Sequence, residues 1–345
     1  EQIDWLHQYP NIDIYVYKDG EVPFSRLVGF LLDFPDIAAA KRKKLPSCHA
    51  LVDGVPYFGE TEPRLKNLDK IPSPYTSGLL DKFFEQKLMP TIQTNRGCPF
   101  TCTYCTEGEQ YYTNVCWVSF ERKKAEIDYI VKRVKHTKTL RITDSNFGMF
   151  PEDVEFCDYL GKVRKETGYP EYLVCSTGKN QKEKMLKCNE LLGGIIRFTA
   201  SVQSLDPVVL QNIKRRNISL EEMMALSDQV SDTDTHSYSE LILALPGDTL
   251  EAEKKSLEWL IAAGVSNITQ HQLMLLYGAE LASRQSRKKF GIKSMFRPAQ
   301  CGVGRFKFDN TPFYATEIEE VCISSNTLSF EDYLEARRLY LTVGL

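Results

Sequence analysis

The sequence predicts an α/β protein in which a repeating unit of strands and helices follows a smaller N-terminal region. Two observations support this prediction: the regular alternation of residues 91–276, and a proline-rich stretch just before it. In the alternating part, short apolar strands are separated by longer amphipathic helices. Such strands pair in parallel through right-handed crossovers, which gives either a doubly wound sheet or a barrel. In both folds, ligands bind at the carboxyl ends of the strands.

The N-terminal region carries one strand pattern and one helical pattern. Residues 12–17 are rich in β-branched and aromatic residues, and residues 22–32 have the apolar spacing of a helix. Residues 1–45 therefore look like the last strand and helix of an α/β unit.

A hairpin and a linker are expected next. Asp53-Gly54 lies between two apolar runs and predicts a tight hairpin, because both turn positions require positive φ. Residues 61–90 contain four prolines and are expected to form an extended linker at a domain boundary.

The repeating unit is assigned from residue type and periodicity. Its strands are expected at 91–95, 139–143, 172–176, 195–201, 237–245 and 267–276. Its helices are expected near 119–135, 151–167, 181–192, 206–230 and 249–263. Pro151 suits a first helical turn, where its missing N–H would have no partner anyway. Asp248 is expected to cap the last helix, and Gly264 to end it.

Composition excludes several classes of protein. The 345 residues are 42% hydrophobic and 26% charged, which is typical of a globular chain of about two domains. The net charge of −3 gives no basic field that would recruit nucleic acid or an anionic membrane. No apolar run approaches the roughly 18 residues of a membrane span, and no secretory signal pattern is present. We expect a cytoplasmic protein without membrane or nucleic-acid partners and, because it starts at Glu1, a piece of a longer chain.

The cysteines fall into two groups. Seven of the ten stand alone and are expected to be buried apolar side chains: Cys48, Cys116, Cys157, Cys175, Cys188, Cys301 and Cys322. The other three, Cys98, Cys102 and Cys105, follow the first strand of the repeating unit within eight residues. Their thiolates can converge on one centre. A structural zinc site would need a fourth ligand, and neither Cys116 nor His136 has a suitable spacing. A cubane iron–sulfur cluster on three thiolates leaves one iron open to a small molecule.

The spacing Cys98-x3-Cys102-x2-Cys105, with Tyr104 before the last cysteine, resembles the signature of radical S-adenosylmethionine (SAM) enzymes. The resemblance runs through most of residues 91–282. It includes the segments 143–148, 201–207 and 240–249. Members of the family fold as a partial (β/α)6 barrel, and this resemblance, rather than the periodicity, selects the barrel.

The resemblance implies two cofactors. Cys98, Cys102 and Cys105 would hold three irons of a [4Fe–4S] cluster, while SAM chelates the fourth iron. One electron from the cluster would then break the sulfonium C–S bond, giving methionine and a 5′-deoxyadenosyl radical that abstracts hydrogen from substrate. A flavodoxin- or ferredoxin-type reductant is implied as the electron source.

Further contacts to SAM are implied at matching positions. Tyr104 stands where the family places an aromatic residue beside the adenine. Asp144, Ser145 and Asn146 stand where many members have Gly-Gly-Glu, with acceptors for the SAM ammonium group. This chain departs from that pattern, so which atoms accept stays open.

The remaining contacts are implied on the fourth and fifth strands. Ser201 and Gln203 lie at the end of the fourth strand, and Gln203 resembles a family glutamine. Arg215, or its neighbour Arg216, resembles an arginine that pairs with the SAM carboxylate, for which its planar fork is suited. Glu240 resembles an acidic residue that binds the ribose hydroxyls. Each could also be an ordinary surface or turn residue.

The region before the cysteines resembles the cobalamin-binding-domain branch of this family. The resemblance rests on the strand and helix, the hairpin, the linker with Ile71-Pro72-Ser73-Pro74-Tyr75, and residues 176–180 and 326–333. The usual cobalt-ligating Asp-x-His-x-x-Gly has no match among the five histidines, so cobalamin is expected only in a full-length protein. The expected domains are a remnant of the cobalamin-binding-like domain at 1–60, a linker at 61–90, the barrel at 91–282 and a C-terminal extension at 283–345.

Two further features bear on the substrate. His271 on the sixth strand is either a substrate contact or a core histidine. Residues 296–320 are rich in Gly, Pro and aromatics, and are expected to be an irregular segment that caps the barrel mouth.

The main hypothesis is a radical SAM enzyme that acts on an unactivated carbon of an unidentified substrate, with methyl transfer as a candidate reaction. The alternative is a metal- or iron–sulfur-stabilised binding or electron-transfer module, which a fourth protein ligand would support. A nucleic-acid-modifying enzyme would require a basic auxiliary domain, and none is visible after residue 282.

Overall fold

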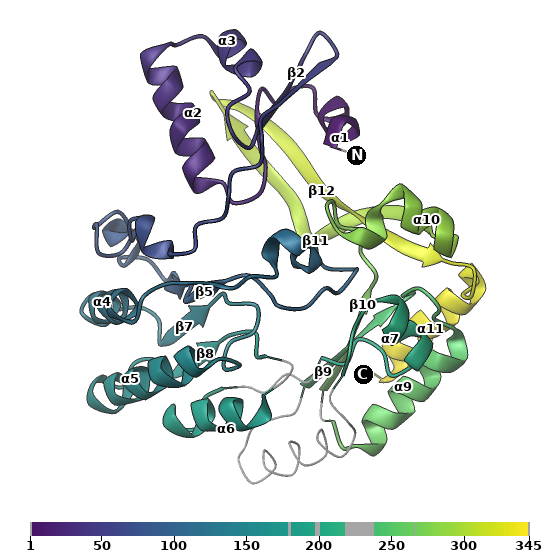
Figure 1. Ribbon diagram of the computed structural model, residues 1–345. Helices are drawn as coiled ribbons and strands as arrows, with labels where there is room; N and C mark the ends of the chain where they lie inside the picture. Colours follow the sequence, from purple (N-terminus) through teal and green to yellow (C-terminus); the bar gives the residue numbers. More distant parts are fainter. Residues whose placement is uncertain (1, 179–180, 197–200, 218–237, 266, 344–345) are drawn as a thin grey trace. The chain divides into compact units, whose positions relative to one another are not determined.

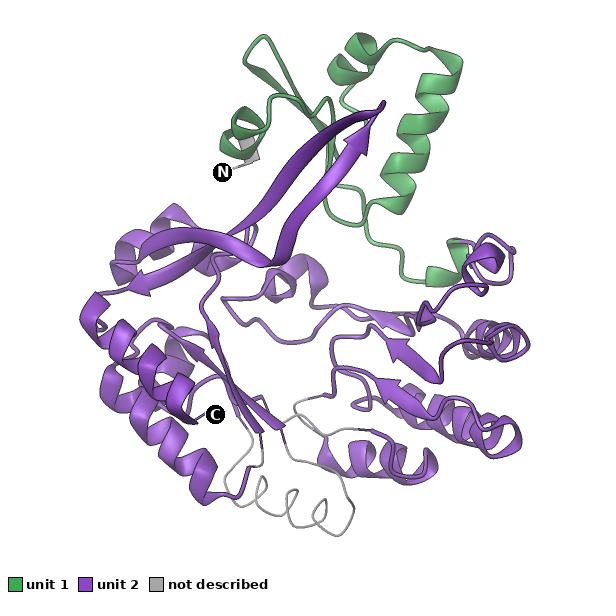
Figure 2. Ribbon diagram, turned by 180° about the vertical axis from the view of Figure 1, so that it is seen from behind, with its two compact units in different colours: residues 1–71 green, residues 72–345 purple. Residues whose placement is uncertain are grey.

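The chain divides into two compact units, Glu1–Ile71 and Pro72–Leu345 (Figures 1 and 2). The computed structural model describes residues 2–178, 181–196, 201–217, 238–265 and 267–343. No helix in these ranges combines the length and the apolar character that crossing a membrane requires.

The first unit is a small antiparallel sheet with three helices. The sheet has the order β1 (Tyr15–Val16), β2 (Cys48–Val52) and β3 (Val55–Phe58), and the helices are α1 (Gln2–Gln8), α2 (Glu21–Asp33) and α3 (Ile37–Arg42). Leu27, Ala40 and Cys48 form its buried core. The predicted hairpin is confirmed, since Asp53 and Gly54 have φ of 51° and 77°. That residues 1–60 end a cobalamin-binding-like domain stays a prediction.

The second unit contains the repeating strands, and their pairing is parallel as predicted. One sheet has the order β4 (Thr91–Ile92), β7 (Thr139–Ile142) and β8 (Tyr172–Val174); the other pairs β9 (Tyr238–Leu243) with β10 (Asn267–Gln272). A parallel bridge joins Gln203 to Leu241. Part of the expected fourth strand, residues 197–200, lies outside the described residues. The described strands form no closed barrel.

The helices of this unit follow the strands as the periodicity predicts. They are α4 (Phe120–Val131), α5 (Pro151–Thr167), α6 (Lys182–Leu191), α7 (Pro207–Asn212) and α9 (Leu250–Ala262). Helices α4, α5 and α6 lie side by side along β7 and β8 (Figure 1). Pro151 occupies the first turn of α5, as expected. The helix expected at 206–230 is shorter than predicted, because α7 ends at Asn212 and residues 213–217 are not helical; residues 218–230 lie outside the described residues.

The prediction that Asp248 caps α9 was wrong by one residue. Thr249 is the N-cap, and its Oγ1 accepts a hydrogen bond from the Ala252 N–H at 3.1 Å. Asp248 is instead buried, and its carboxylate accepts from the N–H groups of Ala244 at 3.0 Å and Thr249 at 2.9 Å. Asp248 therefore fixes the turn between β9 and α9, which leaves the capping position to the next residue.

Two layers of apolar side chains support the strands. Behind β4, β7 and β8, the core includes Ile127, Leu140 and Phe156, all fully buried. Beside β9 and β10, Leu241 packs on Leu257 and Leu260 of α9. Since side chains alternate along a strand, burial of Leu241 and Leu243 on one face of β9 turns Tyr238, Glu240 and Ile242 to the opposite face.

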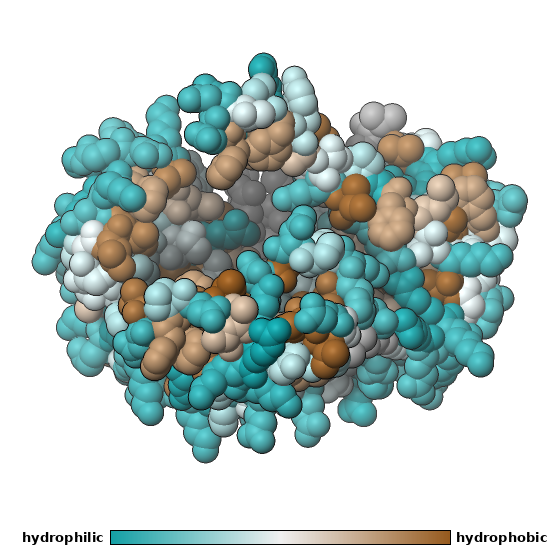
Figure 3. Space-filling model, turned by 90° about the horizontal axis from the view of Figure 1, so that it is seen from above, coloured by the Kyte–Doolittle hydropathy of each residue, from teal (hydrophilic) through white to brown (hydrophobic). Residues whose placement is uncertain are grey.

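The segment expected to be irregular is a long hairpin. Strands β11 (Lys293–Phe308) and β12 (Thr311–Ser324) pair antiparallel between α10 (Arg284–Phe290) and α11 (Phe330–Val343). Asp309 and Asn310 form its turn with φ of 44° and 64°, and a register shift between Pro298 and Val303 accommodates the proline and glycines. Hydrophobic and hydrophilic side chains are interspersed on the face shown in Figure 3. That residues 296–320 cap a barrel mouth stays a prediction.

A matched pair of phenylalanine substitutions tests which apolar contacts stabilise the second unit. Phe156→Ala, at 0% exposure, should lower the free energy of unfolding by about 3–5 kcal/mol, because it removes buried area and leaves a cavity. Phe308→Ala, at 76% exposure, should change it by less than about 0.5 kcal/mol. Denaturant titration followed by circular dichroism measures both. Equal effects would contradict the assigned core.

Candidate active site

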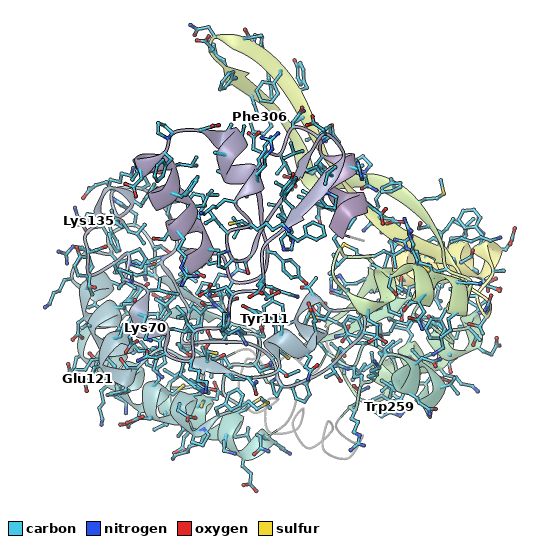
Figure 4. All side chains as sticks on the ribbon, turned by 45° about the horizontal axis from the view of Figure 1, so that its top comes forward. Lys70, Tyr111, Glu121, Lys135, Trp259 and Phe306 are labelled. Carbon is cyan, nitrogen blue, oxygen red and sulfur yellow. The ribbon has the colours of Figure 1, made fainter. Side chains whose placement is uncertain are left out.

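Cys98, Cys102 and Cys105 lie in one loop, residues 97–115, which we call the cysteine loop. Its two ends are joined because β5 (Asn95–Arg96) pairs antiparallel with β6 (Cys116–Trp117). The labelled Tyr111 in Figure 4 marks this loop. The loop therefore starts and ends at the same place, next to β4.

Backbone hydrogen bonds hold the loop in shape. The Cys98 N–H donates to the Tyr112 carbonyl at 3.0 Å, and the Cys105 N–H donates to the Cys102 carbonyl at 3.1 Å. At Gly108, a Cβ atom would lie 2.2 Å from the Cys102 carbonyl oxygen, so only glycine fits. These contacts involve backbone atoms, which leaves the three thiols available.

The three thiols influence one another. Cys102 is buried, whereas Cys98 and Cys105 are half-buried. Burial raises the pKa of the Cys105 thiol, and negative charge on Cys98 or Cys102 raises it further. A positively charged metal centre would reverse that effect, since a coordinating thiol is deprotonated.

Within the described ranges, no three His, Cys, Asp or Glu side chains lie close enough together for a single metal ion. Cys116, the spare thiol of the alternative hypothesis, lies on β6 and donates to the Asn114 carbonyl at 3.8 Å. The described part of the structure therefore shows no site for a mononuclear metal centre. Three thiols without a fourth ligand are the donor set of a cluster with an open iron.

Asp144, at the end of β7, connects that strand to the start of the cysteine loop. Its carboxylate accepts hydrogen bonds from the Thr94 N–H at 2.8 Å, the Asn95 N–H at 3.3 Å and the Asn95 Nδ2 at 3.0 Å, and from the Thr94 hydroxyl. Burial raises the pKa of Asp144 to about 6. Because four donors from the β4–β5 segment occupy its oxygens, Asp144 positions the loop.

The next two residues reach the cysteine loop itself. The Ser145 hydroxyl donates to the Glu107 carboxylate, just after Cys105. The Asn146 Nδ2 donates to the Cys98 Sγ at 3.2 Å. Asn146 is 2% exposed, and its Oδ1 has no hydrogen-bond partner among the described residues.

Arg215 brings Tyr104 and Ser201 together. Its Nη1 donates to the Tyr104 hydroxyl at 3.0 Å, its Nη2 to the Ser201 carbonyl, and its Nε to the Asn217 Oδ1 at 2.9 Å. Arg215 is buried, and it pairs with no carboxylate in the part of the chain that the structure describes. Arg216 is exposed. Burial raises the pKa of the Tyr104 phenol.

Gln203 is held against β9 by its backbone. Its N–H donates to the Glu240 carbonyl, and its own carbonyl accepts from the Ile242 N–H, both at 2.8 Å. It is buried and has a φ of 63°, a left-handed conformation that is uncommon for a residue with a side chain.

Glu240 is the centre of a polar cluster on β9 and β10. Its Oε2 accepts from the Ser201 hydroxyl at 2.6 Å, and its Oε1 accepts from the Tyr238 hydroxyl at 3.1 Å and lies 3.4 Å from the His271 Nε2. The hydrogen bond with His271 lowers the pKa of Glu240 to about 2 and raises that of His271. His271, which the sequence suggested as a substrate contact, thus belongs to the same cluster as Glu240, the residue implied to bind the ribose hydroxyls of SAM.

The structure thus groups the predicted residues in three places. Asp144, Ser145 and Asn146 contact the cysteine loop or its start, Tyr104 and Ser201 meet at Arg215, and Gln203 lies beside Glu240. Sequence reasoning missed Thr94, Asn95 and Glu107, which the pattern gave no reason to single out. The residues present suit the two cofactors that the resemblance implies. Three thiols suit an iron–sulfur cluster, and the buried guanidinium of Arg215 has N–H groups left to donate to the carboxylate of SAM.

Comparison with known families identifies this site. The Radical SAM superfamily matches residues 92–279, which include the cysteine loop, the end of β7, and β9. The chain therefore belongs to the radical SAM superfamily. Proteins of this family bind a [4Fe–4S] cluster and SAM, act on small molecules and generally need a reductant.

Two curated relatives are similar over nearly the whole chain. The cobalamin-dependent radical SAM methyltransferase TokK of Streptomyces tokunonensis is 27% identical, over 96% of this chain and 49% of TokK. The 2-(S-pantetheinyl)-carbapenam-3-carboxylate methyltransferase of Streptantibioticus cattleyicolor is also 27% identical, over 96% of this chain and 49% of that protein. The chain spans about half the length of the curated relatives it matches.

A solved structure supports the fold. The radical SAM methyltransferase TsrM from Kitasatospora setae, with tryptophan substrate and a SAM analog bound, has a TM-score of 0.65 at 13% identity, covering 86% of this chain and 58% of TsrM. The likeness concerns the fold alone. Together with the family match, it confirms the α/β class and the partial barrel. The alternative of a module without radical chemistry gains no support.

The Glu240–His271 pair is testable through the titration of His271. We expect the pKa of His271 to lie above 6.5 and to fall when Glu240→Gln removes the carboxylate, because a neutral amide no longer stabilises the imidazolium. NMR titration of the imidazole signals measures this. Glu280→Gln, which removes a carboxylate paired with Lys214, is the matched control and should leave His271 unchanged. An unaltered His271 midpoint in Glu240→Gln would refute the pair.

Proposed function

We propose that the full-length protein is a cobalamin-dependent radical SAM enzyme that transfers a methyl group to an unactivated carbon of a small molecule. The observation that carries the proposal is the loop with Cys98, Cys102 and Cys105, fixed to the end of β7 inside the family match. Two curated relatives whose names describe methyltransferases support the reaction class.

In this proposal Cys98, Cys102 and Cys105 ligate three irons of the cluster. Such a cluster would supply the one electron needed for reductive cleavage of the C–S bond of SAM. Cys105, whose burial favours the thiol, loses its proton when iron binds, so cluster assembly depends on pH.

The other residues hold SAM. Arg215 has five N–H groups, of which three donate to neutral acceptors in the structure, so the others are available to the SAM carboxylate. Tyr104, fixed by Arg215, lies beside the adenine, and Glu240 with Ser201 binds the ribose. Gln203 completes the SAM-binding surface beside Glu240.

The SAM ammonium group is bound where many family members have Gly-Gly-Glu. Asp144 is occupied by Thr94 and Asn95, which supports a positioning role for it. The Ser145 hydroxyl reaches Glu107, and the Glu107 carboxylate supplies the negative charge for the ammonium group, because the carboxylate of Asp144 is already occupied.

The proposal also includes the cobalamin cofactor with the domain bounds, the electron donor and the cellular compartment. Cobalamin is a cofactor of the full-length protein, with residues 1–60 as the end of its domain, 61–90 as the linker, 91–282 as the barrel and 283–345 as a C-terminal extension. A flavodoxin or ferredoxin supplies the electron. The protein is cytoplasmic, which its ten free cysteines support, because disulfides are rare in a reducing compartment.

Cleavage of SAM tests the proposal. Full-length protein reconstituted anaerobically with iron and sulfide should show the broad visible absorbance of a [4Fe–4S] cluster, and dithionite with SAM should yield 5′-deoxyadenosine. Cys102→Ala should abolish both, since it removes a ligand. Cys116→Ala, which removes the neighbouring spare thiol, should retain both. Loss of iron in Cys116→Ala would instead favour a fully protein-ligated metal.

A pair of adjacent arginines tests how SAM is held. Arg215→Met should raise the Kd of SAM about tenfold to a hundredfold, because a hydrogen bond between charged groups contributes about 1.5–3 kcal/mol. Arg216→Met should leave the Kd within about twofold, since Arg216 is exposed. Isothermal titration calorimetry on the reconstituted enzyme measures both. The reverse order of effects would assign the carboxylate to Arg216.

A further inference from the structure

Asn146 makes an unusual hydrogen bond for a buried asparagine. Its side chain is 2% exposed, four residues after the end of β7, and its Nδ2 donates to the Cys98 Sγ at 3.2 Å. Its Oδ1 is buried without a partner among the described residues. An asparagine that only stabilised this turn would bond to nearby backbone groups. Here the amide is aimed at a sulfur.

The orientation of this amide follows from the chemistry of the sulfur. A thiolate that ligates iron has no hydrogen to donate, so it can accept only from the amide N–H groups. Nδ2 therefore faces Cys98, and Oδ1 faces away from it. Asp144 fixes the direction of the side chain, because its bonds to Thr94 and Asn95 tie the end of β7 to the start of the cysteine loop.

The donor to Cys98 comes from outside the cysteine loop, since Asn146 lies 48 residues along the chain. The bond therefore links the loop that carries the three cysteines to the segment that follows β7.

Hydrogen bonds to ligating sulfurs are one of the factors that set the reduction potential of an iron–sulfur cluster. An N–H that points at a thiolate stabilises negative charge there. The reduced cluster carries one more electron than the oxidised cluster, so the hydrogen bond favours the reduced form and raises the potential. An external reductant then needs less driving force to load the electron.

We propose that Asn146 is a positioning residue that sets the reduction potential of the cluster through its Nδ2–H···Sγ bond to Cys98. This inference rests on the proposed function, because it requires a cluster on the three cysteines. It gives Asn146 a role toward the cluster that differs from binding the SAM ammonium group.

The test is a redox titration of the reconstituted full-length protein without SAM, with the reduced cluster measured by electron paramagnetic resonance. Asn146→Leu removes the donor at similar volume. At a fixed potential, its ratio of reduced to oxidised cluster should fall several-fold to about tenfold, and tenfold corresponds to about 59 mV for one electron. Asn146→Asp has the same shape without the donor, and it should lower the ratio at least as much. Asn189→Leu, on α6 and bonded to the Ile196 N–H, is the matched control and should change nothing.

An unchanged potential in Asn146→Leu and Asn146→Asp, with iron content equal to wild type, would overturn the inference. Loss of the cluster in both would also overturn it, since Asn146 would then act in cluster retention. Failure of the wild type to form any [4Fe–4S] cluster would contradict the proposed function itself.

Discussion

The carboxylate of Asp144 is the constraint on which the candidate site depends. It is buried, and burial of a charged group is costly unless hydrogen bonds compensate. Four donors from Thr94 and Asn95 provide that compensation. Burial raises the pKa of Asp144 to about 6, and the hydrogen bonds from Thr94 and Asn95 oppose that rise. The hydrogen bonds join the second strand of the repeat to the point where the cysteine loop begins.

The residues after Asp144 benefit from this connection. Because the end of β7 is fixed against β5, Ser145 reaches Glu107 and Asn146 reaches Cys98. On the other sheet, Glu240 acts similarly, since Ser201, Tyr238 and His271 all bond to it. The site is therefore assembled by two carboxylates, one for the cysteine loop and one for β9 and β10.

The sequence was most informative where the relevant residues lie close together in the chain. The three cysteines fall within eight residues, and the hairpin at Asp53-Gly54 is local, so both could be recognised. The partners of Asp144 lie about 50 residues upstream, and no periodicity links them. The N-cap of α9 is Thr249 and not the predicted Asp248. Both residue types can cap a helix, and only the tertiary structure shows that Asp248 accepts hydrogen bonds elsewhere. The hairpin of β11 and β12 was missed because glycine and proline suggested irregular chain, whereas a register shift accommodates them.

Gly108 has a consequence for how this protein tolerates sequence change. The Cys102 carbonyl fills the space where any other residue would begin its side chain. Replacement by even the smallest alternative, alanine, would push apart the two turns that present the sulfurs. A position with no functional group of its own is thus as restricted as the ligands beside it, and random mutagenesis should recover glycine there almost without exception.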